Sequence, residues 1–296
     1  MPSGIITKGI GGFYYVSSED GTYECKARGI FRRNEMTPLT GDRVVFSILD
    51  PVLKKGSLDQ ILDRSSILAR PAVANVNQLI AVIAAKTPEP DLMLLDKLLV
   101  NSEVSGMKAV VCINKIDLDK QDLRRDLYKA YSYAGYKVLE TSSKENAGIE
   151  ELNAVLNGRI SVFAGQSGVG KSTLLNMVMN TMVMKTGTLS GKIERGKHTT
   201  RHTELIETEN GGYVVDTPGF SSFELSGIGR IKLQQYYPEF GEFIHACRFS
   251  GCSHLNEPDC AVKQAVADGV INEGRYGRYV ELYAILKLED ESKYKK

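Results

Sequence analysis

The sequence predicts a multidomain protein with a small N-terminal β-barrel, a central α/β part and a mostly helical C-terminal part. Short β-type runs broken by glycine fill residues 1–68. Over residues 69–221, apolar runs of strand length alternate with helical patterns, which is typical of a parallel sheet covered by helices on both faces. From residue 222 to residue 296 the β signal fades and polar helical patterns follow. We therefore expect three domains with these boundaries.

Three strand-like runs predict the barrel. They cover residues 12–16, 23–27 and 42–48, and the turn signal Glu19-Asp20-Gly21 separates the first two. Short strands with intervening turns suit a small closed β-barrel. Basic residues lie among these runs and favour RNA as a ligand, although charges on an outer barrel face are as commonly only solvated.

The central part reads as alternating strands and helices. Strands are expected at 78–85, 108–113, 136–139, 160–164 and 213–215, and helices near 91–104, 119–134, 148–156 and 171–182. Ligands of such sheets bind at the carboxyl ends of the strands. Motifs that directly follow a predicted strand are therefore the first candidates for a functional site.

Composition excludes several classes of protein. Of the 296 residues, 42% are hydrophobic and 25% are charged, and the net charge of +1 is that of an ordinary soluble protein. No secretory leader pattern is apparent, and no run of about 18 apolar residues predicts a membrane span. Three of the five cysteines fall within residues 247–260, which indicates metal binding in a reducing compartment. We expect a cytoplasmic monomer that does not bind membranes.

A glycine-rich loop follows the predicted strand 160–164 and precedes a predicted helix. Its pattern, GxxxxGKS, turns backbone N–H groups inward to cradle phosphates at a helix N-terminus. Lys171 is expected to reach the β- and γ-phosphates and Ser172 to coordinate Mg²⁺. The other expected nucleotide contacts in this loop are Gly165, Gln166, Ser167, Gly168, Val169, Gly170 and Thr173. Taken alone, the loop predicts a nucleoside triphosphate and does not choose the base.

A second motif, Asn114-Lys115-Ile116-Asp117, follows the predicted strand 108–113. The Asp117 carboxylate can accept hydrogen bonds from both N1–H and the N2 amine of guanine, whereas adenine offers no such pair. Asn114 is expected to orient the loop and Lys115 to lie along the base. After the predicted strand 136–139, Ser142, Ser143 and Lys144 are expected near the same base. An ATP-dependent small-molecule kinase or NTPase with a fortuitous NKxD motif remains the alternative.

A third motif, Asp216-Thr217-Pro218-Gly219, ends the predicted strand 213–215. Asp216 is expected to support Mg²⁺, and the Gly219 amide is expected to bond the γ-phosphate and sense hydrolysis. A switch threonine that coordinates Mg²⁺ must lie between Ser172 and Asp216. Thr200 is our choice, with Thr199 as the alternative.

The water-positioning residue is not obvious, because Phe220 and Ser221 follow the third motif where Ras-type GTPases carry glutamine. Either another residue orients the water or a partner completes the site. His198 is the candidate, and a surface histidine is the alternative. The surrounding segment 185–202 carries five Lys/Arg and one acid, so it either contacts RNA or is a solvated loop.

A fourth group of residues predicts a metal site. Three cysteines and one histidine within fourteen residues form a typical closed tetrahedral zinc set. With no open coordination position, such a zinc is structural and contributes to folding. The expected ligands are Cys247, Cys252, His254 and Cys260.

Together the motifs resemble the parts of a GTPase in an unusual order. The usual order is phosphate loop, DxxG, NKxD, whereas here NKID comes first, as in a circular permutation. The segment after DTPG, normally a nucleotide switch, then leads directly into the C-terminal part. A nucleic-acid-binding module in which nucleotide only locks a conformation is a further alternative.

The chain resembles the RsgA (YjeQ/YloQ) family of circularly permuted small-ribosomal-subunit biogenesis GTPases over nearly its whole length. The motifs NKID, GQSGVGKSTLLN, GKHTT, DTPGF and CxxxxCxHxxxxxC carry the resemblance, all in family order. It implies an N-terminal OB-fold barrel, GTP hydrolysis stimulated by the 30S ribosomal subunit, and a late role in maturing that subunit. It also implies that the barrel and the zinc-binding domain contact 16S rRNA, and that His198 aids hydrolysis.

Overall fold

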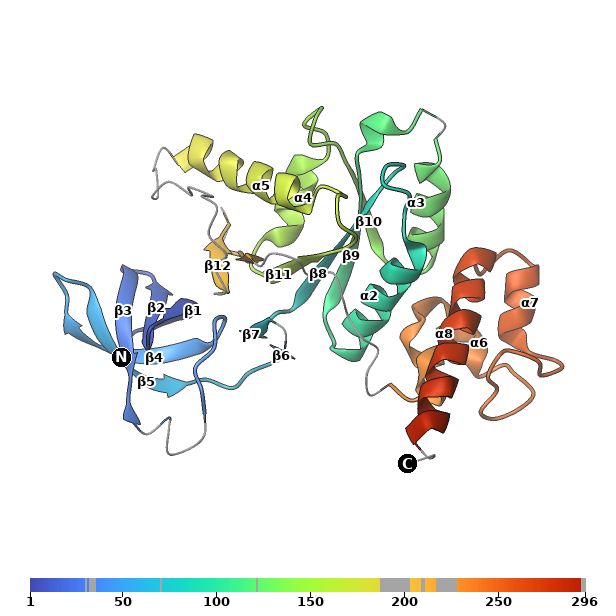
Figure 1. Ribbon diagram of the computed structural model, residues 1–296, viewed down its shortest axis with the longest axis horizontal. Coiled ribbons are helices and arrows are strands. Elements are labelled where there is room, and N and C mark those ends of the chain that lie inside the picture. Colours follow the sequence, from blue (N-terminus) through green and yellow to red (C-terminus); the bar gives the residue numbers. More distant parts are fainter. Residues whose placement is uncertain are drawn as a thin grey trace. The chain divides into compact units, whose positions relative to one another are not determined.

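The computed structural model describes residues 1–29, 31, 36–69, 71–120, 122–186, 203–208, 211–216 and 228–293. Figure 1 shows the helices and strands along the chain. The chain divides into two compact units, each built from separate stretches of sequence. The first contains Met1–Gln78, Glu150–Phe163 and Thr173–Phe220. The second contains Leu79–Ile149, Ala164–Ser172 and Ser221–Lys296.

In the first unit, five described strands close a barrel: β1 (Ser3–Ile10), β2 (Phe13–Ser18), β3 (Gly21–Ala27), β4 (Arg43–Asp50) and β5 (Lys55–Ile61). The strands β1, β2 and β3 form an antiparallel meander, β3 pairs with β5 in parallel, and β4 pairs with both β5 and β1. Alternate side chains of these strands form an apolar interior around Ile6, Val16 and Phe46. The predicted barrel is confirmed, although the sequence patterns had indicated neither β1 nor β5.

The rest of the first unit adds strands and helices next to the barrel. Strand β12 (Glu204–Glu207) pairs antiparallel with β1 and with β13 (Tyr213–Asp216), and β13 runs parallel to β11 (Ile160–Ala164). An ion pair of 3.0 Å between Lys8 and Glu204 accompanies the β1–β12 pairing. The other elements are a hairpin of β6 (Ile67–Ala69) and β7 (Ala72–Ala74), and the helices α4 (Ile149–Leu156) and α5 (Lys171–Thr186).

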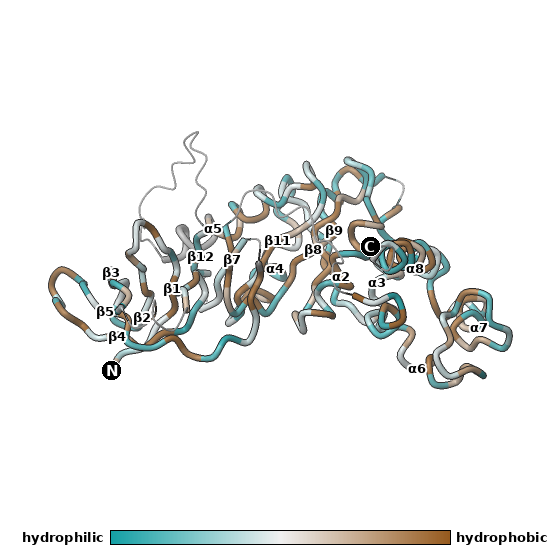
Figure 2. Tube along the Cα trace, turned by 60° about the horizontal axis from the view of Figure 1, so that its bottom comes forward, coloured by the Kyte–Doolittle hydropathy of each residue, from teal (hydrophilic) through white to brown (hydrophobic). Residues whose placement is uncertain are grey.

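The second unit contains the strands β8 (Gln78–Ala84), β9 (Lys108–Asn114) and β10 (Lys137–Thr141), in the order β10-β9-β8. Strands β9 and β10 are parallel, and every residue of β8 is buried. Figure 2 shows the hydrophobic character of β8 and β9, as expected for strands covered on both faces. Helix α2 (Leu92–Val104) begins after Asp91, whose side chain accepts a hydrogen bond from the Leu94 amide.

Helix α3 (Arg124–Tyr133) is shorter than the predicted helix 119–134. The short 3₁₀ turn η1 (Ile116–Leu118) precedes the predicted range, and the described residues between η1 and α3 are not helical. The Asp119 carboxylate then accepts hydrogen bonds from the amides of Leu123 and Arg124. An aspartate that satisfies free N–H groups at a helix start marks the boundary, so the helix begins after Asp119 rather than at it.

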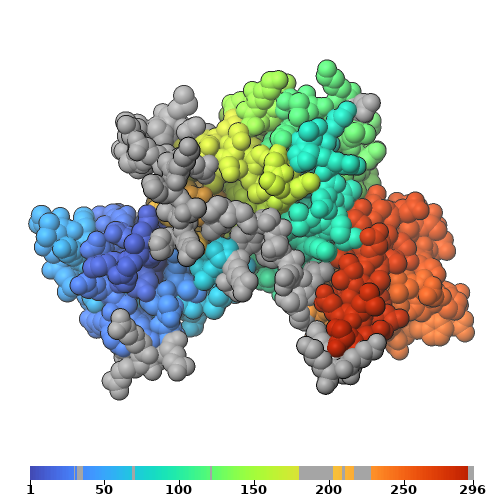
Figure 3. Space-filling model, viewed as in Figure 1, coloured from blue at the N-terminus to red at the C-terminus, as the bar shows by residue number. Residues whose placement is uncertain are grey.

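The C-terminal segment is helical, as predicted, and forms a compact body (Figure 3). Its elements are η2 (Arg230–Tyr236), η3 (Pro238–Phe240), α6 (Gly241–Ile244), α7 (Ala261–Ala267) and α8 (Glu273–Lys293). They share an apolar core that includes Phe240, Val262 and Tyr279. Among the described residues, no helix is both long and apolar enough to cross a membrane.

A buried ionic cluster ties this body to α2 and α3. The Asp96 carboxylate of α2 accepts hydrogen bonds from Arg275 Nη1 (2.6 Å), from Arg278 Nε and from the Tyr131 hydroxyl (3.0 Å). Arg275, which is 1% exposed, also pairs with Glu239. Opposite charges that are buried together in this way hold the elements that carry them in one arrangement.

Candidate functional site

The glycine-rich loop connects β11 to α5 in a conformation that depends on glycine. Gly165 and Gly170 have φ values of +142° and +99°. A Cβ at Gly165 would lie 2.0 Å from the Val82 carbonyl oxygen, so no larger residue fits. The Lys171 ammonium donates to the carbonyl oxygens of Gly165 (2.7 Å) and Gln166 (2.9 Å), and burial lowers its pKa. The loop therefore holds its own lysine close to the backbone that would cradle phosphates.

Asn114 connects three structural elements. It is the last residue of β9, and its side chain is wholly buried. Its Nδ2 donates to the Val169 carbonyl in the glycine-rich loop at 2.8 Å, and its Oδ1 accepts from Thr141 Oγ1 at the end of β10 at 3.1 Å. The amide thus holds the first motif against both the loop and the neighbouring strand.

Two further contacts bring the NKID loop and the glycine-rich loop together. Lys115 Nζ donates to the carbonyl oxygens of Gly168 (2.6 Å) and Thr87 (2.9 Å). A Cβ added at Gly170 would lie 2.4 Å from Asn114 Nδ2, so the missing side chain makes room for the asparagine. Residues more than fifty positions apart therefore form one continuous surface within the second unit.

Asp117 is held by the serine that follows β10. Ser142 Oγ donates to Asp117 Oδ1 at 2.7 Å and accepts from the Glu145 amide at 3.1 Å. Asp117 lies in η1 and remains half-exposed, so its carboxylate can still accept bonds from a ligand. Ser143 is half-buried and Lys144 is exposed in the turn that follows. Ser142 thus fixes the orientation of the Asp117 carboxylate.

The remaining predicted nucleotide contacts are placed less completely. Ser172 and Thr173 lie exposed in the first turn of α5, and Ser167 is exposed in the loop. Asp216 is the last residue of β13, in the first unit. His198, Thr199, Thr200 and Gly219 lie outside the described residues.

The four predicted metal ligands meet in the C-terminal body. Their ligand atoms all lie within 4.8 Å of one another, so Cys247, Cys252, His254 and Cys260 could hold a metal ion. Nδ1 of His254 is 3.3 Å from Cys260 Sγ and 3.6 Å from Cys247 Sγ. Burial lowers the pKa of His254, which favours the neutral imidazole that metals require. The fold therefore gathers the four predicted ligands in one place.

The backbone around these ligands is fixed by hydrogen bonds. Glu257 accepts from the amides of Ser253 and Leu255 at 2.8 and 2.9 Å. Burial alone would raise the pKa of Glu257, but the bonds from Ser253 and the neighbouring amides lower it to about 2. The Tyr276 hydroxyl donates to the His254 carbonyl at 2.7 Å. Sequence patterns had indicated none of these supporting residues, because no local motif distinguishes them.

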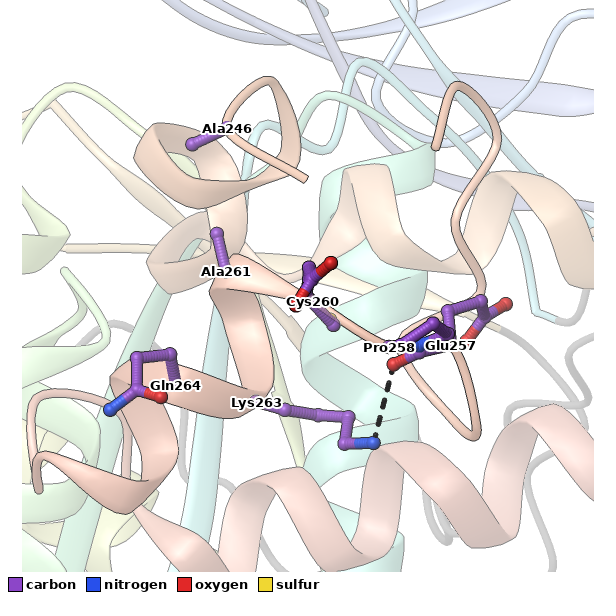
Figure 4. A pocket seen from close by; sticks show the side chains of 8 residues that line it. Ala246, Glu257, Pro258, Cys260, Ala261, Lys263 and Gln264 are labelled. Atoms are coloured by element: carbon purple, nitrogen blue, oxygen red, sulfur yellow. Dashed lines mark hydrogen bonds between the residues drawn. The ribbon is translucent and has the colours of Figure 1, made fainter. Parts of the chain in front are cut away.

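A pocket of about 500 Å³ lies on the outer side of this centre. Figure 4 shows Lys263 reaching toward the Glu257 carbonyl along its wall, with Cys260 beside them. The Cys260 side chain is only 6% exposed there. One ligand of the centre, Cys260, is therefore part of the pocket wall.

Comparisons with known proteins find similar chains. The RsgA GTPase family matches residues 61–226, and the RsgA N-terminal domain family matches residues 3–52. A small ribosomal subunit biogenesis GTPase RsgA from Ruminiclostridium cellulolyticum is 56% identical over 289 residues, covering 97% of this chain and 94% of that protein. Its namesake from Alkaliphilus metalliredigens is 46% identical over 97% of this chain and 98% of its own length.

Two solved structures are similar over nearly the whole chain. YjeQ from Thermotoga maritima has a TM-score of 0.83 and 39% identity, with 96% of this chain and 98% of that chain covered. YloQ, described as a circularly permuted GTPase, has a TM-score of 0.83 and 40% identity, with 98% and 96% covered. The fold is therefore shared with two solved proteins, one of which is described as a circularly permuted GTPase.

Proposed function

Because this chain belongs to the RsgA GTPase family, we propose that it hydrolyses GTP on the 30S ribosomal subunit and assists the late maturation of that subunit. We further propose that the 30S subunit stimulates turnover. The observation that carries the nucleotide part is the direct hydrogen bonding between the NKID loop and the glycine-rich loop. Base and phosphates of one nucleotide can be read together only when these two loops lie side by side.

Each loop residue then has a role in binding. The Asp117 carboxylate, oriented by Ser142, accepts the N1–H and N2 hydrogens of guanine. Lys115 lies along the base, and Asn114 keeps the loop against the phosphate cradle. Lys171 exchanges its two carbonyl contacts for the β- and γ-phosphates when nucleotide enters. The phosphate oxygens then replace the two carbonyl oxygens as hydrogen-bond acceptors for the ammonium, which favours binding of a triphosphate.

The residues proposed for Mg²⁺ are Ser172, Thr200 and Asp216. Bound with GTP, the ion would neutralise charge on the β- and γ-phosphates. Gly219 would bond the γ-phosphate and release it after hydrolysis. His198, in the switch segment, is proposed to orient the attacking water in place of the glutamine that this chain lacks after DTPG.

The Cys₃His centre is proposed to hold a structural zinc ion. In tetrahedral zinc sites, bonds of about 2.3 Å to sulfur and about 2.0 Å to nitrogen separate the ligand atoms by about 3.5–3.8 Å. Here the separations among Cys247 Sγ, Cys260 Sγ and His254 Nδ1 are 3.3–3.9 Å. The residues present therefore fit the ion, which would crosslink the loops that supply its ligands.

We also propose the partners and the division of labour. The OB-fold barrel (1–68) and the zinc-binding domain (222–296) would contact 16S rRNA, and the permuted GTPase domain (69–221) would bind GTP and GDP. The protein would act as a monomer in the cytoplasm. The ribosomal role is supported by relatives that are named small ribosomal subunit biogenesis GTPase RsgA and that match this chain over nearly their whole length.

The deciding experiment measures phosphate release from GTP with and without purified 30S subunits. Turnover should be slow alone and rise strongly with 30S subunits, while 50S subunits serve as the matched control. Equal turnover under all three conditions would refute the coupling to the small subunit. ATP should fail to displace labelled GDP, and displacement as efficient as that by GTP would favour a kinase instead.

A further inference from the structure

Gln234 lies directly behind the candidate metal centre. It belongs to η2, is 8% exposed, and its Oε1 is 2.7 Å from Nε2 of the wholly buried His254. Twenty residues separate the two in sequence, and none of the predicted motifs includes Gln234. This amide is the only described polar side chain within hydrogen-bond distance of that imidazole nitrogen.

The second hydrogen bond of Gln234 settles which way its amide points. Its Nε2 donates to the Ile231 carbonyl at 3.1 Å, and a carbonyl can only accept. The amide oxygen must therefore face His254. An oxygen accepts, so His254 Nε2 must carry the proton, and the free lone pair of the imidazole is on Nδ1. Nδ1 is the atom that faces Cys247 and Cys260.

The imidazole is held in this orientation from other sides as well. The rings of Phe240 and Tyr279 lie 5.9 and 6.3 Å from the imidazole centroid. His254 itself has φ +60°, a left-handed conformation that is uncommon for histidine. Ring packing limits the tilt of the imidazole but does not select which nitrogen is protonated. The hydrogen bond to the Gln234 oxygen makes that selection at Nε2.

We propose that Gln234 is the positioning residue of the metal centre: it fixes the Nδ1-ligating form of His254 and ties metal occupancy to η2. Hydrogen bonds from the far nitrogen of a ligating histidine orient the ring and strengthen its binding to the metal. The inference rests on the proposed metal site. It goes further because the metal would then order η2, which is the first described element after the Asp216–Gly219 motif in the sequence.

The test compares Gln234→Leu with Gln234→Glu in the full-length protein. Leucine keeps the volume and removes the acceptor, so zinc affinity measured by chelator competition should fall about 10- to 100-fold. Glutamate keeps an acceptor toward Nε2 and should restore affinity to within a few-fold of wild type. The control is Gln264→Leu, because Gln264 is exposed on α7 and the described hydrogen bond of its side chain goes to Asp268. Its affinity should equal that of wild type.

A second readout follows the cobalt-substituted protein and does not depend on activity. Wild type and Gln234→Glu should show the visible absorption of a tetrahedral thiolate–imidazole site, whereas Gln234→Leu should show a weakened or shifted band. Hydrogen exchange of η2 should increase on chelation in wild type and already be fast in metal-loaded Gln234→Leu.

Three outcomes would overturn the inference. Wild-type affinity in Gln234→Leu would show that the acceptor is dispensable. Equal losses in Gln234→Leu and Gln234→Glu would show that an acceptor toward His254 Nε2 does not set the affinity. η2 exchange that does not respond to chelation in wild type would remove the link to η2. A wild-type protein that takes up no zinc or cobalt would instead refute the proposed metal site itself.

Discussion

Replacing Asp96 with alanine removes the buried carboxylate that joins α2 to the C-terminal body. The cluster contains two positive and two negative side chains, namely Arg275, Arg278, Asp96 and Glu239. Without Asp96 the cluster carries an excess positive charge, and Arg275 cannot escape to water because its side chain is 2% exposed. Arg278, at 15% exposed, can turn outward in part. The loss therefore falls mainly on Arg275.

The expected cost follows from that burial. Removing one member of a buried ion pair costs about 3–5 kcal/mol, because the remaining charge stays desolvated. The Tyr131 hydroxyl loses its acceptor as well. Glu239 remains paired with Arg275, so we expect a loss of stability near the lower end of this range. An opening free energy reduced by about 3 kcal/mol accelerates exchange of protected amides by about a hundredfold.

Hydrogen exchange is the suitable assay because it reports each element separately in a multidomain chain. Amides of α2 and α8 should exchange about a hundredfold faster in Asp96→Ala, while those of the barrel should not change. Glu140→Ala is the control, because its ion pair with Arg124 is about one-third exposed on both sides and should contribute less than about 1 kcal/mol. Exchange in α8 within threefold of wild type would refute the reasoning.

Three further predictions concern the two sites. Asp117→Asn should lower GTP affinity about 10²- to 10⁴-fold, since two charge-assisted hydrogen bonds are lost. The same substitution should create affinity for xanthosine triphosphate. Retained GTP affinity in a competition assay would contradict this prediction. Gly170→Ala should weaken binding of a fluorescent GDP analogue at least tenfold, because the new Cβ would lie 2.4 Å from Asn114 Nδ2. The control is Gly135→Ala, where φ is +91° and no atom lies within 4 Å, and this variant should bind the analogue normally. Equal losses of affinity in both variants would show that the contact with Asn114 is not the cause. Chelation should lower the temperature at which the C-terminal helices unfold, as followed by circular dichroism. Cys252→Ser should show the same lowered unfolding temperature without chelator. An unfolding temperature that neither change affects would mean that no metal stabilises the helices.

Local patterns predicted the central strands closely, because each is a short apolar run that ends at a polar motif. They did not predict β1 or β5. In β1 the pairing with β2 shifts register between Ile6 and Lys8, and in β5 Gly56 and polar residues interrupt the apolar alternation. These strands are stabilised by pairing with other strands of the barrel, and a short window of sequence does not include those partner strands. The helix start at Arg124 depended on side-chain capping by Asp119, which the apolar periodicity ignores.

The sequence by itself determined the chemistry that this chain carries. The NKID, GQSGVGKS and DTPG motifs and their order, together with the Cys₃His spacing, predicted a permuted guanine-nucleotide site and a metal centre, because these depend on residue type at short spacing. Only the tertiary structure decided which residues support that chemistry. The bond from Asn114 to Val169, the acceptor that Gln234 offers His254, and the Asp96–Arg275 pair join residues 55, 20 and 179 positions apart. A buried polar group needs a hydrogen-bond partner, and the three-dimensional fold determines which residue lies close enough to be that partner.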